Sequence, residues 1–389
     1  MKKEKNILKF ILIIPVILIL AIVFVWKNEI FTIMSIKEIM PEDKNHSDGK
    51  VLTIDAKGDY YLDDLLKQGG VKSDKELINF LTRKITKGLF KLSIEESNIG
   101  CSSYTASLAD GDNIFARNYD MKTTHIALVH TKPSKGRYES ISTVDLSFLG
   151  VKAEDNPNTL KSKFNMLAAA YTPLDGINEK GLSVGIYMSY QGPSKEDYPT
   201  DQNTDKDDIT STILLRLMLD KAKTVEEAIE IAKSYDMHDS AGSSFHYMVA
   251  DASGNSAILE YIGKSDKTDT DGSKRELNVI YNDKNKNKKG QVVTNFIVSK
   301  NYYDNDDTKF GLDRYELINK ELTNKNFILD DENHAMDILA KVGRRNWDNK
   351  DKNTITTHSV IYNMNKLESY LVANEHFGDK NYVYRFKFK

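Results

Sequence analysis

The sequence contains very little cysteine, with one residue, Cys101, among 389. A single cysteine excludes a disulfide within the chain, and it excludes a zinc site built from several thiolates. Three interpretations stay open at this point: a buried inert thiol, a bridge to another chain, or a reactive nucleophile.

The sequence also lacks an excess of charge of one sign. It has 54 basic and 57 acidic residues, which gives a formal net charge of -3. A nucleic-acid partner normally requires a basic stripe, so we expect none. The eight histidines form no HExxH and no other cluster with metal-ligand spacing, and GxGxxG, P-loop and GxSxG motifs are missing. We therefore expect neither a metal nor a cofactor.

One long apolar run stands near the N-terminus. Lys2, Lys3 and Lys5 precede an uncharged stretch from Phe10 to Trp26. With Ile7 and Leu8 added, a rise of about 1.5 Å per residue makes it just long enough to cross a bilayer. The lysines favour a cytoplasmic N-terminus, and no small-residue cleavage site follows. We expect residues 1–30 to be an uncleaved signal-anchor that crosses the cell membrane once. The catalytic domain would then lie on the extracytoplasmic side.

The rest of the chain divides into two predicted parts. Residues 31–100 are expected to be a linker and pro-segment, and residues 101–389 one catalytic domain. Within the first part, Asp43–Lys50 is polar and predicts a loop. Ser73–Phe90 predicts an amphipathic helix, because Ser73 and Glu76 have capping-box spacing and leucines recur at helical intervals.

After Cys101 the pattern changes to runs of strands interrupted by pairs of helices. Ser103–Ala109 and Asn113–Asn118 flank Asp110–Gly111, which predicts a hairpin. Phe164–Tyr171 is among the further strand-like runs. This order predicts an α+β fold with antiparallel sheets, and it does not fit the regular alternation of a doubly wound fold.

The hairpin brings chemistry toward the cysteine. The returning strand carries Arg117 and ends at Asp120, and a guanidinium near a thiol favours the thiolate. If the chain is cut between Gly100 and Cys101, the new α-amine, with a reference pKa of about 7.7–8.0, could accept the thiol proton. Asp120 could orient that amine. The alternative is an ordinary hairpin with a surface Arg–Asp pair, which is common and contributes little.

The pattern Cys101, Arg117, Asn118, Asp120 resembles the choloylglycine hydrolase family, which includes bile salt hydrolases and penicillin V acylases. The resemblance extends from about Cys101 to the C-terminus. The other similar segments are Asp175–Leu182, Ser244–Asp251 with Glu260, Val293–Asn295 and Asp313–Tyr315.

This resemblance implies a four-layered αββα N-terminal-nucleophile hydrolase that cleaves linear, non-peptide C–N amide bonds through a thioester. It implies Cys101 as the nucleophile, with Arg117 and Asp120 tuning the thiol and the α-amine. It also implies that Arg314 stabilises charge near the cysteine.

Two further residues would bind the oxyanion. The resemblance implies that Asn295 donates its side-chain amide and Tyr187 its backbone N–H, while the Tyr187 ring stacks on an aromatic acyl group. Tyr190, Phe296 and Tyr302 could line an acyl pocket with Tyr187, or they could belong to the core.

A hundred residues precede the cysteine, whereas many members of that family carry a very short leader. The arrangement is more similar to acid ceramidase-type amidases and to the acyl-CoA:6-aminopenicillanic acid acyltransferase group, where a pro-segment is removed autocatalytically. Gly100 agrees with such cleavage, because a glycine carbonyl is sterically open to the adjacent thiol. Cleavage would release the catalytic domain from the membrane unless the pro-segment stays bound.

The expected substrate joins an apolar or aromatic acyl group to a small polar amine, as in penicillin V, conjugated bile salts and N-acyl amino acids. Two alternatives stay open. The thioester could pass to an amine, which would make the protein an acyltransferase, or the chain could be a non-catalytic surface-binding homologue. The sequence also leaves a homo-oligomer open.

Overall fold

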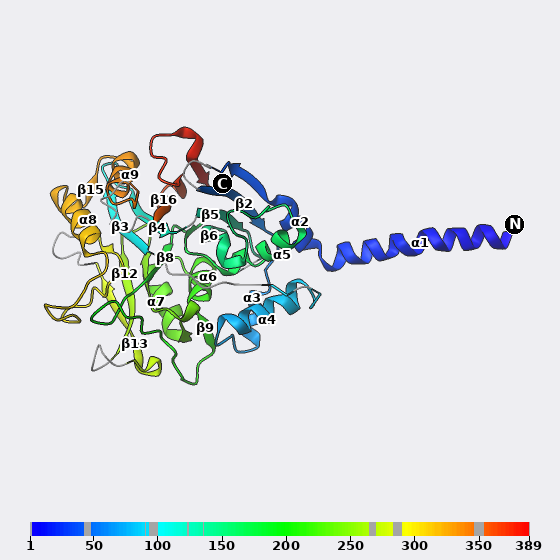
Figure 1. Cartoon of the computed structure of the whole chain (residues 1–389), viewed down its shortest axis with the longest axis horizontal. Coiled ribbons are helices and arrows are strands. Elements are labelled where there is room, and N and C mark those ends of the chain that lie inside the picture. Colours follow the sequence, from blue (N-terminus) through cyan, green and yellow to red (C-terminus); the bar gives the residue numbers. More distant parts are fainter. Residues whose placement is uncertain are drawn as a thin grey trace.

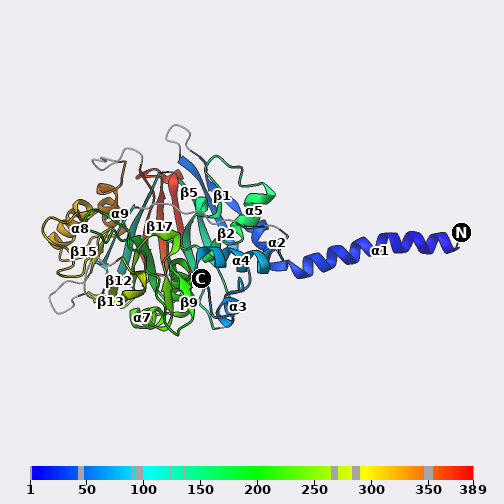
Figure 2. The ribbon, with the colours of Figure 1, turned by 60° about the horizontal axis from the view of Figure 1, so that its bottom comes forward.

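The computed structural model describes residues 2–42, 48–89, 91–92, 100–122, 124–134, 136–263, 270–282, 290–345 and 354–388, without the side chains of residues 2–13, 48 and 124. Two large β-sheets pack face to face at its centre, and helices cover their outer faces (Figure 1). The view in Figure 2 shows the same body from below, with helix α1 projecting away from it.

The first sheet has nine strands, all of which come from the part of the chain before residue 282. Its order is β1 (Lys37–Met40), β2 (Asp48–Ala56), β5 (Thr124–Thr131), β6 (Ser140–Asp145), β7 (Asp175–Asn178), β8 (Ser183–Met188), β11 (Phe245–Ala250), β12 (Ser256–Gly263) and β13 (Arg275–Tyr281).

The second sheet has seven strands and carries the cysteine. Its order is β14 (Val292–Val293), β3 (Gly100–Leu108), β4 (Asn113–Met121), β16 (Ile355–Asn363), β17 (Glu368–Ala373) and β18 (Val383–Lys387), with β15 (Ile328–Leu329) paired to β3. A separate two-stranded ribbon joins β9 (Asp208–Thr210) to β10 (Asp236–His238).

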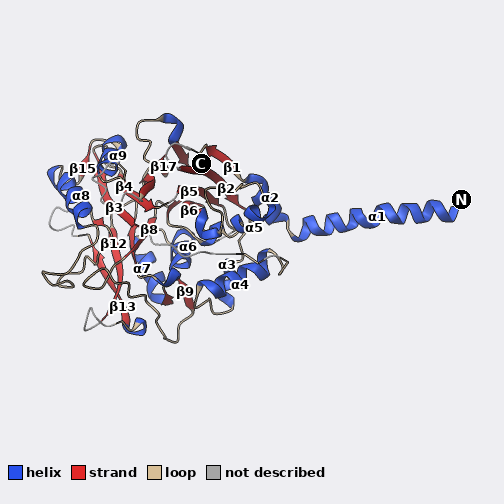
Figure 3. Ribbon diagram, viewed as in Figure 1, coloured by secondary structure: helices blue, strands red, loops and turns tan. Residues whose placement is uncertain are grey.

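The helices complete four layers (Figure 3). Helices α6 (Ser211–Lys221) and α7 (Val225–Ser234) pack on the nine-stranded sheet, and α8 (Leu312–Asn324) and α9 (Glu332–Lys341) pack on the seven-stranded sheet. Strands β3 and β8 contact each other across the interface between the sheets. The predicted α+β class and its αββα layering are therefore present.

The sheets are mostly antiparallel, as expected, with three exceptions. Strand β2 pairs with β5 in parallel, β15 pairs with β3 in parallel, and the β9–β10 ribbon is parallel. The β3–β4 hairpin forms at the predicted turn, where Gly111 has a φ of +94° that suits glycine.

The prediction of a linker for residues 31–100 is corrected by β1 and β2. Both strands belong to the nine-stranded sheet, and β2 pairs with β5 from Val51 to Ala56. Its apolar residues Val51, Leu52 and Ile54 are buried in the core, so the sheet gains apolar burial from this segment. Of the predicted loop at 43–50, residues 43–47 lie outside the described part, and residues 48–50 open β2. Removal of the segment by cleavage stays a prediction.

Two local predictions also change. The predicted helix at 73–90 is α4 (Asp74–Ile85), where the Ser73 hydroxyl caps the Glu76 amide at 3.3 Å and the chain turns off after Ile85, leaving Leu89 exposed. The predicted strand Phe164–Tyr171 is wrong. Helix α5 (Leu160–Met166) and a short 3₁₀ turn occupy it, because Thr159 caps the Ser162 amide and starts a helix.

Helices α1 (Lys2–Val25) and α2 (Lys27–Ser35) lead into the body, followed later by the short α3 (Leu62–Lys67). From Ile14 to Val25 the apolar side chains of α1 are exposed. Among the described residues, no single helix has the length and apolarity needed to cross a membrane. The bent pair Ile14–Val25 and Lys27–Ser35, with an angle of 76°, meets that test only when the two are taken together.

Candidate active site

Strand β3 holds the thiol of Cys101 in the space between the two sheets. Cys101 pairs with Tyr119 on β4, and its Sγ lies 3.9 Å from the Ile186 carbonyl oxygen on β8 of the opposite sheet. Side chains alternate along a strand, so Arg117 on β4 shares this inner face. The Cys101 side chain is fully buried. The hairpin therefore places the Cys101 thiol and the Arg117 guanidinium side by side.

Arg117 contacts the thiol directly. Its Nη2 donates to Cys101 Sγ at 3.2 Å, and its Nη1 donates to the Leu174 carbonyl oxygen at 2.7 Å. Its Nε pairs with Asp175 Oδ2 at 3.2 Å, and both side chains are fully buried. Arg117 and Asp120 are both buried, and Asp120 pairs with Arg314, which excludes the alternative of a surface Arg–Asp pair in the hairpin. The pair with Asp175 fixes the Arg117 cation against the sulfur.

Asp175 is held in turn by two buried residues of β16. His358 Nε2 lies 2.9 Å from Asp175 Oδ2, and the Tyr362 hydroxyl donates to the other carboxylate oxygen. Burial acts to raise the pKa of Asp175, but the charges and hydrogen bonds of His358 and Arg117 outweigh it and hold that pKa below its usual value. Asp175 therefore stays ionised and keeps Arg117 in place.

The backbone of Cys101 is bound by a second group of side chains. Its N–H donates to Asn295 Oδ1 at 3.0 Å, and Arg314 Nη1 donates to its carbonyl oxygen at 2.6 Å. Arg314 Nη2 also donates to Asn295 Oδ1 at 2.9 Å, and Arg314 Nη1 lies 3.3 Å from Asp120 Oδ2. Cys101, Arg117, Asp120, Asn295 and Arg314 thus form one buried cluster, which we call the cysteine site.

Asp120 and Asn295 have other partners than those expected of them. Asp120 accepts hydrogen bonds from Arg314 and, at 2.7 Å, from the Thr356 hydroxyl, while the Cys101 nitrogen is held by Asn295. The Asn295 side-chain amide donates to the Met188 carbonyl oxygen at 3.0 Å. In this chain, with Gly100 attached, both residues therefore position the cysteine backbone.

Burial dominates the titration of the thiol. It raises the pKa of Cys101 to about 11, against the opposing positive charge of Arg117. Burial also lowers the pKa of Arg314. The thiol is therefore protonated near neutral pH while its nitrogen remains in a peptide bond, and a base is needed to activate it.

Tyr187 lies behind the thiol. Its ring is fully buried, with the Arg117 guanidinium 4.6 Å from the ring centre and His246 edge-on at 5.8 Å. His246 is fully buried, and its ring is hydrogen-bonded to the Thr294 carbonyl oxygen at 2.9 Å, as a core histidine requires. The Tyr187 ring is therefore packed against the Arg117 guanidinium.

Two of the other predicted aromatic residues lie beside Asn295: Tyr190, whose N–H donates to the Asn295 carbonyl oxygen at 3.0 Å, and Phe296, the next residue in the chain. Tyr190 packs edge-on against Phe310, and Phe296 packs against Tyr303. Tyr302 also stacks edge-on with Tyr303. These rings form an apolar border beside the cysteine site.

Sequence reasoning missed the support behind Arg117. Asp175 was noted only as part of a turn motif, and His358 and Tyr362 were not singled out. The one available signal was the acidic residue of the DGxN motif, since a buried arginine requires a buried carboxylate. The sequence also predicted no metal site, yet the fold brings Asp208, Asp236 and His238 together, which is taken up below.

The chain was compared with known proteins. Residues 107–376, more than half of the chain, match the family described as acyl-coenzyme A:6-aminopenicillanic acid acyl-transferase. No curated protein matches the sequence.

Solved structures resemble the chain at low identity. They include a conjugated bile acid hydrolase from Clostridium perfringens (16% identity, 74% of this chain and 92% of that chain, TM-score 0.48). They also include penicillin V acylase from Agrobacterium tumefaciens (15%, 74% and 86%, TM-score 0.47) and an N-acylethanolamine-hydrolyzing acid amidase orthologue from Caenorhabditis elegans (14%, 74% and 100%, TM-score 0.38). On the family match, the chain belongs to the acyl-coenzyme A:6-aminopenicillanic acid acyl-transferase family.

Proposed function

We propose that this protein is an N-terminal-nucleophile hydrolase of linear, non-peptide C–N amide bonds, activated by cleavage between Gly100 and Cys101. The single observation that carries the proposal is that buried polar side chains bind the sulfur, the nitrogen and the carbonyl oxygen of Cys101. Arg117 contacts the Cys101 sulfur, Asn295 its nitrogen and Arg314 its carbonyl oxygen. An inert core cysteine needs none of these buried charges, which are costly to desolvate.

The proposed activation step is an attack within the chain. Cys101 Sγ adds to the carbonyl carbon of Gly100, the C–N bond breaks as the nitrogen gains a proton, and Gly100 is left as a thioester on the sulfur. Water then hydrolyses the thioester, which gives a Gly100 carboxylate and a Cys101 with a free amine and thiol. Arg117 supports the developing thiolate from 3.2 Å.

The free amine then supplies the missing base. In its neutral form it accepts the thiol proton, and the sulfur attacks the carbonyl carbon of the substrate amide. The resulting ammonium protonates the leaving amine, and water cleaves the acyl thioester. Asp120, 3.3 Å from Arg314, would orient the ammonium once the Gly100 peptide bond is broken.

The oxyanion would be stabilised by Asn295 and the Tyr187 backbone N–H. For this role the Asn295 amide must exchange its present partner, the Met188 carbonyl oxygen, for the substrate oxygen. Such a donor typically contributes about 2.7–4 kcal/mol to lowering the barrier. Arg314, which holds Asn295 Oδ1 at 2.9 Å, keeps the amide directed.

The proposed substrates are N-acyl amides of the penicillin V, bile-salt or N-acyl amino acid type. The apolar border of Tyr190, Phe296 and Tyr302 beside the cysteine site suits an aromatic or apolar acyl group. The Tyr187 ring, buried against the Arg117 guanidinium, would hold that cation beside the Cys101 sulfur.

A second candidate function is acyl transfer to an amine, favoured by the family match at residues 107–376. Both reactions share the thioester and differ in what attacks it. Incubating the processed protein with an N-acyl amide and a series of competing amines separates them. In hydrolysis the acyl group appears only as the free acid. In transfer it also appears in new amides, in an amount that rises with the concentration of the competing amine.

We also propose that α1 anchors the protein in a cell membrane, with the catalytic domain on the extracytoplasmic side. The proposal is supported by the exposed apolar side chains from Ile14 to Val25. Strand β2, paired with β5, would keep the anchor attached after cleavage. The full chain should resist alkaline extraction from membranes, and a chain lacking residues 2–26 should not.

The hydrolase proposal is tested with Cys101→Ser and an N-acyl amide that releases a measurable amine. Loss of at least about 10³-fold in kcat/KM is expected, because the weaker hydroxyl nucleophile must be activated in a site built for a thiol. A rate close to that of the unaltered protein would overturn the assignment of Cys101. A folded, uncleaved protein that never reacts with an acyl probe would indicate the non-catalytic homologue.

A further inference from the structure

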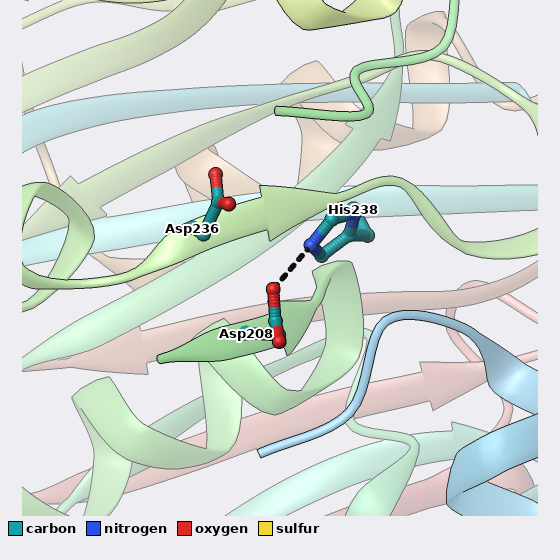
Figure 4. Close-up of side chains that lie close together, drawn as sticks. All are labelled: Asp208, Asp236 and His238. Carbon is teal, nitrogen blue, oxygen red and sulfur yellow. Dashed lines mark hydrogen bonds and ion pairs between the residues drawn. The ribbon is translucent and has the colours of Figure 1, made fainter. Parts of the chain in front are cut away.

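The parallel β9–β10 ribbon brings Asp208 together with Asp236 and His238, which lie about thirty residues further along the chain. Asp208 pairs in register with Asp236, and His238 follows two residues later on β10. One possible ligand atom from each side chain lies within 4.8 Å of those of the other two. Figure 4 shows the three side chains close together, with the His238 ring directed at the Asp208 carboxylate and Asp236 beside it on the same strand as His238.

His238 is held as a metal-binding histidine usually is. Its Nε2 lies 2.9 Å from Asp208 Oδ1, and its Nδ1 lies 2.6 Å from Asp201 Oδ1 on the opposite side of the ring. The ring is nearly buried, with 5% of its side chain exposed. A carboxylate on the far nitrogen orients the ring and strengthens the near nitrogen as a ligand.

Asp236 supplies the second observation. It is 1% exposed, and its Oδ2 accepts a hydrogen bond from the Thr204 amide at 2.8 Å. Its Oδ1 is also buried and has no hydrogen-bond partner among the described residues. A buried carboxylate oxygen without a partner is costly, and a cation bound there removes that cost.

We propose that Asp208, Asp236 and His238 bind a divalent cation, and we call them the cation site. One imidazole nitrogen and two carboxylates are ligands typical of Zn²⁺ in proteins, with a water in the fourth position. Lys72 Nζ, 3.8 Å from Asp208 Oδ1, is the exposed group that the cation would displace.

The cation site also touches the N-terminal segment, through the backbone of Asp208. The Val71 N–H donates to the Asp208 carbonyl oxygen at 3.0 Å, and the Asp208 N–H donates to the Gly69 carbonyl oxygen at 3.0 Å. Between them Gly70 has a φ of +79°, and a Cβ there would lie 1.7 Å from that Asp208 oxygen. A cation that holds Asp208 in place would therefore also stabilise the backbone hydrogen bonds between Asp208 and residues 69–71.

The test uses the full chain in detergent, without a histidine tag, in a Cys101→Ala background that removes the thiol as a competing ligand. Metal is stripped with a chelator, and Zn²⁺ is titrated back against a chromophoric chelator. One equivalent is expected to bind, with a rise in the midpoint of thermal unfolding. No binding, or binding without a fixed stoichiometry, would overturn the proposal.

Four variants assign the ligands. Asp236→Asn and His238→Gln should weaken Zn²⁺ binding by about a hundredfold or more, and Asp201→Asn by about 10–100-fold through the ring orientation. Asp205→Asn removes the same charge from the neighbouring exposed loop and should bind like the parent. Asp201 is 78% exposed in its side chain, so Asp201→Asn remains informative if the buried variants fail to fold. Equal affinity in all variants would show that His238 only links the carboxylates of Asp201 and Asp208 through hydrogen bonds.

Discussion

The cysteine site and the cation site are both buried polar clusters, and they have opposite electrostatic character. Two arginines contact Cys101, Arg117 at its sulfur and Arg314 at its carbonyl oxygen. By contrast, two carboxylates face the ring of His238, one on either side. A site rich in fixed cations stabilises an anion, such as a thiolate or an oxyanion. A site rich in carboxylates stabilises a cation. The comparison indicates that the fold keeps the proposed catalytic cysteine and the proposed cation ligands in two separate clusters of opposite charge.

The sharpest test of the cysteine site is Arg117→Met. It removes the cation at the sulfur and leaves the buried Asp175 without its arginine, held only by His358 and Tyr362. We expect kcat/KM to fall by about 10³-fold or more, and the free energy of unfolding to fall by about 3–5 kcal/mol. Kinetics on the folded fraction and denaturant unfolding measure the two effects.

The matched control is Arg216→Met. Arg216 is equally buried and pairs with Asp220 at 2.7 Å, without a contact to the cysteine site. It should lose comparable stability and keep kcat/KM within a few-fold. If both variants lose the same activity, Arg117 acts only through folding.

A smaller effect is expected for Asn295→Ala. Loss of its proposed oxyanion hydrogen bond should lower kcat by about 10²–10³-fold with a smaller change in KM. Asn118→Ala is the control, because Asn118 is also buried and its amide donates to the Leu339 carbonyl oxygen on α9. A kcat loss shared by both variants would contradict the oxyanion role.

Processing should depend on pH in a way that catalysis does not. The thiol of the uncleaved chain has a pKa raised to about 11, so its reactive thiolate fraction grows about tenfold per pH unit below that value. Freshly translated chain should therefore be cleaved faster at each step from pH 7 to 9. The processed enzyme should level off above about pH 8, where its α-amine is neutral. A processing rate that is flat over the same range would contradict the account.

The smallest effect is expected for Gly100→Ala. A Cβ at residue 100 would lie 3.2 Å from the Asp120 Cβ and 3.3 Å from its Oδ2, which is tight but tolerable after a small shift. We expect cleavage to slow by about tenfold, which corresponds to about 1.4 kcal/mol in the barrier. Intact mass against time measures it, and Gly111→Ala, at an exposed turn, serves as a control for general effects on folding. Cleavage faster than in the parent would contradict the argument that a glycine at residue 100 keeps the scissile carbonyl open to the thiol.

The sequence was informative where contacts are local. The Asp110–Gly111 turn and the Ser73 cap could both be read directly. The β3–β4 hairpin then placed Arg117 next to Cys101, because strand alternation decides which side chains share a face.

Contacts between distant segments could not be read in this way. The parallel pairing of β2 with β5 and of β9 with β10 joins residues with no common pattern in the sequence. Hence a segment predicted to be a linker lies within a sheet, and Asp236 and His238 meet Asp208 without any metal-ligand spacing. Asp175 was missed for the same reason, since its partner His358 is far along the chain.

The central claim is that the working enzyme begins at Cys101, and the most direct measurement is the intact mass of the purified active protein together with its N-terminal sequence. The account predicts a chain that starts at Cys101, alongside an N-terminal fragment ending at Gly100, and a Cys101→Ala variant that keeps its full length. A fully active protein in which Gly100 is still bonded to Cys101 would contradict it.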